Sequence, residues 1–352
     1  MHTKIINISS CRQKNEAEIK SAADVILHGG LVVFPTETVY GIGADATNEE
    51  AVTRIYEAKG RPSDNPLIIH VSSPEQAEAY THTTPMYYKL AELFMPGPLT
   101  VILKSKDTVP LRTRGGLDTV AVRCPSHPIA RQLISAAGVP IAAPSANLSG
   151  SPSPTTAAHV ISDMLGRVDV IIDGGDAEFG LESTIVKIED DDTLTLLRPG
   201  KITVEQLLAA ANEVKIADAV TEILADSEKA LSPGMKYRHY APKASLVLLD
   251  GSYEDIYSFV SSLPQDEKTA IIIYTEYISD LKKMRPDITY YDFGEEDNQG
   301  AQAHRLFSLL RDTDKDSFSV IYAPLPSKEG IGLALYNRMI RAAAHKIIRL
   351  RR

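Results

Sequence analysis

Two cations stand two residues apart in the segment Lys59–His70, KGRPSDNPLIIH, between a helical pattern that stops at Gly60 and an extended path favoured by Pro62. Lys59 and Arg61 held on such a turn suit an anion, because arginine binds phosphate oxygens through paired hydrogen bonds. The alternative is a solvated helix C-terminus, where cations are favoured in any case. The spacing predicts a phosphate site, but it does not exclude an ordinary solvated helix end.

Uncharged polar groups gather in the segment Ile141–Thr155, IAAPSANLSGSPSPT, where serine and asparagine alternate with small residues. Their hydroxyl, amide and backbone donors suit the polar end of a small substrate or phosphate oxygens. An ordinary serine-rich loop is the alternative. Arg123 ends a strand pattern, where it would either pair with surface carboxylates or reach a ligand beyond the carboxyl edge of the sheet.

Glycines also follow the apolar run 31–33 in FPTETVYGIGAD, Phe34–Asp45. Gly41-Ile42-Gly43 lacks the third glycine of a dinucleotide fingerprint, and the sequence contains no Gly-Lys-Ser/Thr of a P-loop. Taken alone, the stretch predicts a strand end followed by a tight polar turn.

The sequence offers no recognisable nucleophile or metal cage. It has no Gly-x-Ser-x-Gly elbow, no Ser-His-Asp order and no His-Glu-x-x-His, and two cysteines cannot build a thiolate metal site. Anion-binding and hydroxyl-binding residues without a nucleophile are typical of enzymes that act by positioning and charge neutralisation, as in phosphoryl and nucleotidyl transfer.

The elements that must position these residues alternate along the chain. We expect strands over Leu31–Phe34, Leu67–Val71, Leu99–Lys104, Thr119–Arg123, Ile141–Ala143, Val168–Asp173, Ser183–Ile188 and Leu194–Arg198. We expect helices over Ala17–His28, Glu49–Ala58, Pro74–Thr81, Pro128–Gly138, Thr156–Leu165 and Val204–Ala211. The 352 residues suggest two domains of the α/β class.

A second series of alternating strands and helices follows a stretch that contains prolines and aromatic residues. Residues 213–243 are a linker candidate, and strands over Leu246–Leu249, Ala270–Tyr274, Ile288–Phe293 and Ser319–Tyr322 then alternate with helices over Tyr253–Leu263, Ala301–Arg311 and Leu333–Ile348. That alternation predicts a smaller, doubly wound parallel-sheet, Rossmann-like domain over 244–352.

Composition narrows the class of protein. A net charge of −9 argues against a protein that mainly coats nucleic acid. No apolar run approaches the roughly 18 residues of a membrane helix, and the N-terminus lacks the apolar core of a signal peptide, so we expect a cytoplasmic protein.

Taken together, the motifs resemble a known family. FPTETVYGIGAD, KGRPSDNPL, MPGPLTVIL, VAVRCPSHP, PSANLSGSPSPT, ESTIV and LRPG match, in order and spacing, the YrdC-like domain of threonylcarbamoyl-AMP synthases. SPGMKYRHYAP and the domain after it resemble the longer, two-domain type. The resemblance implies a twisted, mixed open sheet flanked by helices over 15–212 and a linker, 213–243, that we expect to cover the active site.

The resemblance also implies a reaction and a set of partners. L-threonine, bicarbonate or carbon dioxide, and ATP would give threonylcarbamoyl-AMP and pyrophosphate. A separate enzyme would then use the product to modify the adenosine beside the anticodon of certain tRNAs. Mg²⁺ would offset the repulsion between the anionic reactants, and we expect ATP phosphates and water to supply most of its ligands.

Residue by residue, the resemblance assigns two binding sites and the cations between them. Lys59 and Arg61 would be the catalytic cations, offsetting the repulsion between the anionic reactants as the nucleotidyl group is transferred. The threonine site would comprise Thr36, His70, Arg123, Ser145 and Ser183. The nucleotide site would comprise Lys59, Arg61, Ser63, Asn65, Thr119, Asn147, Ser153, Arg198 and Tyr237.

Two other functions stay open from the sequence alone. One is a YrdC-like RNA-binding module, against which the acidic total and the lack of aromatic stacking motifs count. The other is a carbamoyltransferase of hydrogenase maturation, whose chains are expected to carry zinc-finger cysteines that this sequence lacks.

Overall fold

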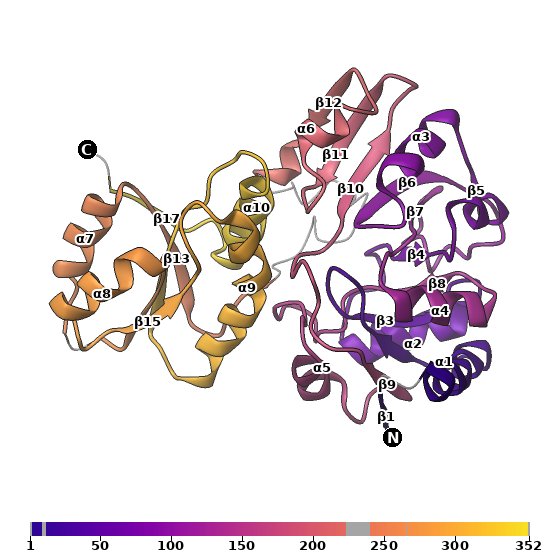
Figure 1. The fold of residues 1–352 in the computed structure, drawn as a ribbon, viewed down its shortest axis with the longest axis horizontal. Helices are drawn as coiled ribbons and strands as arrows, with labels where there is room; N and C mark the ends of the chain where they lie inside the picture. Colours follow the sequence, from indigo (N-terminus) through magenta and orange to yellow (C-terminus); the bar gives the residue numbers. More distant parts are fainter. Residues whose placement is uncertain (1, 9–11, 223–239, 266, 351–352) are drawn as a thin grey trace. The chain divides into compact units, whose positions relative to one another are not determined.

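The computed structural model describes residues 2–8, 12–222, 240–265 and 267–350. The chain divides into two compact units, one comprising Met1–Ser149 and Ser153–Lys236, the other Gly150–Pro152 and Tyr237–Arg352 (Figure 1). None of the described helices combines the length and the apolar character that crossing a membrane requires.

A mixed sheet forms the first unit, in the order β1-β9-β2-β3-β8-β4-β7-β6-β10-β11-β12, with β5 paired to β6. Its strands are β1 Lys4–Asn7, β2 Val32–Phe34, β3 Gly41–Asp45, β4 Ile68–His70, β5 Thr81–His82, β6 Leu99–Ser105, β7 Thr119–Arg123, β8 Ile141–Ala142, β9 Val170–Asp173, β10 Thr184–Ile188, β11 Thr193–Arg198 and β12 Glu213–Ile216. Parallel and antiparallel pairs alternate irregularly, which confirms the mixed open sheet.

Helices and short 3₁₀ turns connect these strands. They are α1 Arg12–Leu27, α2 Glu49–Lys59, η1 Pro74–Ala79, α3 Pro85–Phe94, α4 Pro128–Ala137, α5 Ala157–Met164, α6 Val204–Leu207 and η2 Asp218–Val220. The buried stripe of α4, with Ile129, Leu133 and Ile134, packs beside α1 over Phe34 and Ile141 of the sheet. This layer fixes the strands whose ends carry the site.

The tight turn expected after Phe34 is wrong in its second half, because Gly41–Asp45 is strand β3, antiparallel to β2. The glycines serve packing. A Cβ at Gly43 would lie 2.6 Å from Cγ2 of Ile141 and 2.7 Å from Cε1 of Phe34. Only a residue without a side chain lets the Phe34 ring lie against the neighbouring strand.

The second unit contains a parallel sheet in the order β15-β14-β16-β13-β17. Its elements are β13 Ser245–Asp250, α7 Tyr253–Ser261, β14 Thr269–Ile273, α8 Thr275–Met284, β15 Thr289–Asp292, α9 Gln299–Asp312, η3 Thr313–Lys315, β16 Val320–Pro324, α10 Gly332–Ala342 and β17 Ile347–Arg349. Helices α7 and α8 pack through Ile256, Val260 and Leu281 on one face, and α9 and α10 lie on the other (Figure 1). The doubly wound architecture is confirmed.

Two boundaries differ from the sequence prediction. The last helix ends at Ala342 instead of Ile348, because Ala344 and His345 have φ values of 48° and 61° and the chain then pairs as β17 with β13. The linker does not begin at residue 213, because Glu213–Ile216 pairs in parallel with β11.

The aromatic part of the linker is described only at its end. Tyr237, Arg238 and His239 lie outside the described residues. Tyr240 is buried, and its ring stacks on Phe307 of the second unit with centroids 5.0 Å apart.

Candidate functional site

Strand register gathers one group of polar side chains at a single edge of the first sheet. His70 pairs with Arg123 across the parallel β4–β7 ladder, and Arg123 pairs with Thr100 across β6–β7. Ser183 directly precedes β10, and the first residue of β10 pairs with the first residue of β6. The second residue of β10 pairs with Arg198, the last residue of β11. Three of the five residues assigned to threonine, His70, Arg123 and Ser183, therefore lie at one edge.

Arg123 forms a buried ion pair with Glu37. Its Nη2 lies 2.7 Å from Oε1 of Glu37, and the two side chains are 5% and 2% exposed. Burial alone would raise the pKa of the Glu37 carboxyl, but the charge and hydrogen bond of Arg123 outweigh it and hold that pKa below its usual range. The buried Nε of Arg123 has no hydrogen-bond partner among the described residues. A donor therefore remains for an anionic ligand.

Thr36 shapes the turn next to this pair. Its hydroxyl donates to the carbonyl of Val39 at 2.6 Å and accepts from the backbone N–H groups of Thr38 and Val39 at 3.2 and 3.3 Å. Nη2 of Arg123 lies 3.5 Å from the same oxygen. The Thr36 hydroxyl donates to Val39 and shares its acceptor sites among the neighbouring N–H groups, the Thr38 hydroxyl at 2.9 Å and Arg123, so it holds the turn beside the ion pair.

His70 is buried as a neutral imidazole. Burial, with the nearby charge of Arg123, lowers the pKa of His70 to about 3. Its Nδ1 lies 3.3 Å from the carbonyl oxygen of Ile141, and its ring meets the Phe34 ring edge-on with centroids 6.3 Å apart. Since the carbonyl can only accept, Nδ1 carries the hydrogen and Nε2 is an acceptor.

Ser183 is held between two neighbours. Its Oγ lies 2.7 Å from Oγ1 of Thr100 and accepts from Nη2 of Arg198 at 3.0 Å, while its carbonyl accepts from Nε of Arg198 at 3.0 Å. Both Ser183 and Thr100 are fully buried. Arg198, assigned to the nucleotide, thus directly contacts a residue assigned to threonine.

Lys59 is placed by the end of α2. Asn48 caps the start of the helix, with its side chain accepting from the N–H groups of Glu50 and Ala51, and Gly60 caps its end, where a left-handed φ of 60° suits glycine. The Lys59 ammonium is buried and donates to the carbonyl of Ser145 and, at 2.6 Å, to that of Asn147. The cation is thereby fixed to the serine-rich loop.

Ser145 belongs with this cation and not with the Arg123 edge. Its Oγ lies 2.5 Å from Oδ1 of Asn147, and its backbone bridges Gly41 of β3. Ser153, further along the loop, is fully buried and donates to Oε1 of Glu182 at 2.5 Å.

The remaining nucleotide candidates occupy the opposite ends of the strands. Nη2 of Arg61 donates to the carbonyls of Pro66 at 3.2 Å and Asn65 at 3.5 Å, on the turn that enters β4. Ser63 is exposed on that turn, and Thr119 begins β7. Thr119 and Arg123 stand at the two ends of β7, about 13 Å apart for four residues of extended chain. Lys59 and Arg61 donate to different backbone carbonyls.

Sequence reasoning missed three buried partners: Glu37, Thr100 and Glu182. Each is a second member of a pair whose first member was identified. Glu37 offered a usable signal, because it is the single carboxylate in the apolar segment FPTETVYG and neighbours Thr36. Buried carboxylates are rarely unpaired, so a cation partner was predictable although its identity was not.

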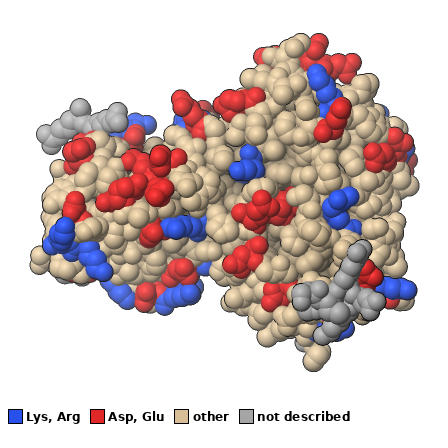
Figure 2. Space-filling model, viewed as in Figure 1, with Lys and Arg blue, Asp and Glu red and all other residues tan. Residues whose placement is uncertain are grey.

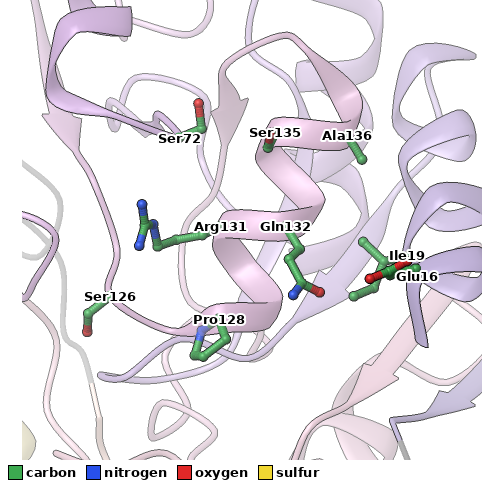
Figure 3. A pocket seen from close by; sticks show the side chains of 9 residues that line it. All are labelled: Glu16, Ile19, Ser72, Ser126, Pro128, Arg131, Gln132, Ser135 and Ala136. Atoms are coloured by element: carbon green, nitrogen blue, oxygen red, sulfur yellow. The ribbon is translucent and has the colours of Figure 1, made fainter. Parts of the chain in front are cut away.

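A separate hollow of about 700 Å³ lies in the first unit beside α1 and α4 (Figure 3). It is lined by Glu16, Ile19, Ser72, Ser126, Pro128, Arg131, Gln132, Ser135 and Ala136. None of these residues was predicted for the site. The hollow nevertheless adjoins it, because the backbone N–H of His127, next to Ser126, donates to Oε2 of Glu37 at 3.4 Å.

Charged side chains and metal-ligating side chains are both dispersed in the described parts of the chain. On the face in Figure 2, lysine and arginine side chains are scattered among carboxylates and form no broad basic surface. Within the described parts of the chain, no three His, Cys, Asp or Glu side chains are grouped as metal ligands.

Two family models match the chain one after the other. Residues 24–200 match the family described as "Telomere recombination", and residues 202–344 match "Threonylcarbamoyl-AMP synthase, C-terminal domain". The chain is 42% identical over 354 residues to a threonylcarbamoyl-AMP synthase of Pyrococcus abyssi, covering 99% of this chain and 100% of the relative. It is also 42% identical over 357 residues to the Bacillus subtilis threonylcarbamoyl-AMP synthase, with 99% and 100% coverage.

A solved structure gives the same similarity in three dimensions. The crystal structure of P. abyssi Sua5 complexed with L-threonine superimposes with a TM-score of 0.88 at 41% identity, covering 99% of each chain.

Proposed function

The chain belongs to the threonylcarbamoyl-AMP synthase family, and from this premise we propose how its residues share the reaction. Its activity is the synthesis of threonylcarbamoyl-AMP, a nucleotidyltransferase-type reaction that consumes ATP and serves threonylcarbamoyladenosine biosynthesis in tRNA. Full-length similarity to synthases supports this activity over the RNA-binding and carbamoyltransferase alternatives.

Threonine binds at the edge formed by β4, β6 and β7. We assign its carboxylate to Arg123, whose buried Nε lacks a partner among the described residues; this observation carries the proposal. The Nε2 atom of His70 can only accept, which suits the substrate ammonium or hydroxyl. Thr36 lies beside Arg123 and stays a candidate for the same substrate. Ser183 borders the same edge through Thr100 and Arg198.

The nucleotide binds along the loop tied to Lys59 and the turn that carries Arg61. Lys59, Asn147, Ser153 and Arg198 lie on or beside buried segments, so they are positioned before ATP arrives. Ser145 joins this group and would lie between the two substrates. Ser63, Asn65 and Thr119 remain candidates for the end of the nucleotide further from Arg123, and Tyr237 remains a candidate from the linker.

The chemistry then balances without a protein nucleophile. Bicarbonate gives carbon dioxide and hydroxide, and the hydroxide takes the proton released from the threonine ammonium. The free amine forms a bond to carbon dioxide and releases a second proton from its nitrogen to solvent, giving a carbamate. A carbamate oxygen attacks the α-phosphorus, the bond from that phosphorus to the bridging oxygen breaks, and pyrophosphate leaves. The residues named here hold and neutralise the reactants.

Mg²⁺ is part of the proposal as an ion that accompanies ATP. Because no group of carboxylate, histidine or cysteine ligands gathers in the described residues, we assign its ligands to phosphate oxygens and water. The ion supplies neutralisation of phosphate charge.

The product is a hydrolysable mixed anhydride. We propose that it passes in the cytoplasm, where ATP and tRNA are present, to a separate enzyme that transfers the threonylcarbamoyl group to tRNA.

The proposal is tested by threonine-dependent release of pyrophosphate from ATP in the presence of bicarbonate. Pure full-length protein should require all three substrates, and Arg123→Gln should raise the threonine KM far more than the ATP KM. Pyrophosphate release that is independent of threonine, or equal effects on both KM values, would contradict the assignment.

A further inference from the structure

Hydrogen bonds hold the turn over residues 110–116 in shape and join it to the segment that carries Arg61. Within the turn, the N–H of Thr113 bonds to the carbonyl of Pro110 at 3.1 Å, and that of Gly116 to Leu111 at 2.9 Å. Outward, the Thr113 carbonyl accepts from Leu67 at 3.0 Å, and its fully buried hydroxyl donates to Ala46 at 2.9 Å.

Gly115 shows how closely the two segments approach each other. Its φ is +60°, and a Cβ built there would lie 2.9 Å from the backbone nitrogen of Pro66 and 3.1 Å from the carbonyl oxygen of Asp64. Any other residue would force the segments apart. The neighbouring Arg114 is therefore held directly beside the turn that follows Arg61.

A chain of hydrogen bonds links Arg61 to Arg112. The carbonyl of Asn65 accepts from Nη2 of Arg61 at 3.5 Å and from the hydroxyl of Tyr56 at 2.9 Å, and the same hydroxyl lies 3.3 Å from the carbonyl of Arg112. Burial raises the pKa of Tyr56 to about 12, although the charges of Arg61 and Arg112 oppose that rise. Both cations thus lie near one phenol.

The guanidinium groups of Arg112 and Arg114 stand without a partner among the residues that the structure describes. Neither group makes a hydrogen bond or an ion pair with a described residue, although both side chains are only partly exposed. Nε of Arg114 is buried without a partner. A partly desolvated cation without a carboxylate is costly, and an anionic ligand would offset that cost.

We propose that Arg112 and Arg114 form, beside Arg61, a phosphate-binding subsite. The ligand chemistry is a phosphate group approached by guanidinium donors, which bind it bidentately. Two sources carry such a group: the phosphates of ATP or pyrophosphate, and the backbone of RNA. The attachment of the turn to the Arg61 segment favours the nucleotide, and in naming ATP the inference rests on the proposed function.

Binding of inorganic pyrophosphate to the full chain, measured calorimetrically without threonine, tests the subsite separately from turnover. Arg112→Gln and Arg114→Gln should each weaken binding about tenfold, the factor expected for losing a hydrogen bond to a charged group. Arg112→Lys should retain charge and weaken binding less. Lys89→Gln is the control, because Lys89 is an exposed cation of the same unit, on α3, without a described side-chain partner.

The same variants are then titrated with ATP and with a short synthetic RNA hairpin. Weaker binding of pyrophosphate and ATP assigns the subsite to the nucleotide, and weaker binding of RNA alone assigns it to an RNA phosphate. Unchanged affinity for all three probes in a double variant with an unchanged melting temperature would overturn the inference. A chain that binds pyrophosphate through these residues but makes no adenylate would refute the proposed function and leave the subsite standing.

Discussion

Replacing Glu37 with glutamine removes the charge that Arg123 requires in a buried position. Glu37 is buried, and its two oxygens accept from Arg123 and from the backbone N–H of His127. In Glu37→Gln one of these acceptors becomes an NH₂ donor that faces another donor. Losing one member of a buried pair typically costs 3–5 kcal/mol, and because glutamine keeps one acceptor we expect about 3 kcal/mol.

The assay is urea unfolding of the full chain, followed by far-UV circular dichroism because the sequence contains no tryptophan. The matched control is Glu189→Gln, which breaks the 2.6 Å ion pair between Glu189 and Lys187. The side chain of Lys187 is 39% exposed and that of Glu189 is 32% exposed. An ion pair at that exposure contributes about 1 kcal/mol or less. The threonine KM should also rise in Glu37→Gln, since Arg123 loses its anchor.

The pH dependence gives a second signature of the same pair. A carboxyl whose folded pKa lies below its ordinary 4.5 stabilises the protein fully above pH 4.5 and loses that contribution as the pH falls through the folded pKa. The difference between wild type and Glu37→Gln should therefore shrink below pH 4.5. Equal losses in Glu37→Gln and Glu189→Gln, or a pH-independent difference, would refute the reasoning.

Three other predictions follow from the site. Lys59→Ala and Arg61→Ala should each lower kcat/KM for adenylate formation by an amount equivalent to about 2–4 kcal/mol, and near-wild-type turnover in both would remove the phosphate assignment. Serine should be used less well than threonine by about 1–3 kcal/mol and 2-aminobutyrate should be worse, a ranking that equal use of 2-aminobutyrate and threonine would contradict. Burial keeps His70 neutral down to its pKa of about 3, so threonine affinity should show no titration of His70 near pH 6.5. The free energy of unfolding should fall as the pH drops below 6.5, because the unfolded chain then binds a proton that buried His70 does not. A midpoint near pH 6.5 in threonine affinity that His70→Gln abolishes would contradict this.

Much of the fold follows from local pattern. Buried strands such as Thr119–Arg123 are continuous β-branched or apolar runs, and helices such as α4 carry a regular buried stripe, so their positions are legible in the sequence. Strand β3 was missed because two of its five residues are glycines whose function is contact with Phe34, a tertiary requirement that overrides strand propensity.

Partners distant in the chain could not be predicted. Glu37 and Arg123 are separated by 86 residues, and only the register of β4, β6 and β7 decides that His70, Arg123 and Thr100 meet. The same register places Thr119 at the far end of β7. Motif order supplied candidate residues, whereas the sheet decided which of them are neighbours.

Formation of threonylcarbamoyl-AMP from carbon-13 bicarbonate tests the central claim most directly. Pure protein, L-threonine, ATP and labelled bicarbonate should yield an adenylate that carries the label in its carbamoyl carbon, with one pyrophosphate released per adenylate, as followed by mass spectrometry. Omitting threonine should abolish both products. An adenylate without the label, or pyrophosphate release without a threonine-containing adenylate, would contradict the account.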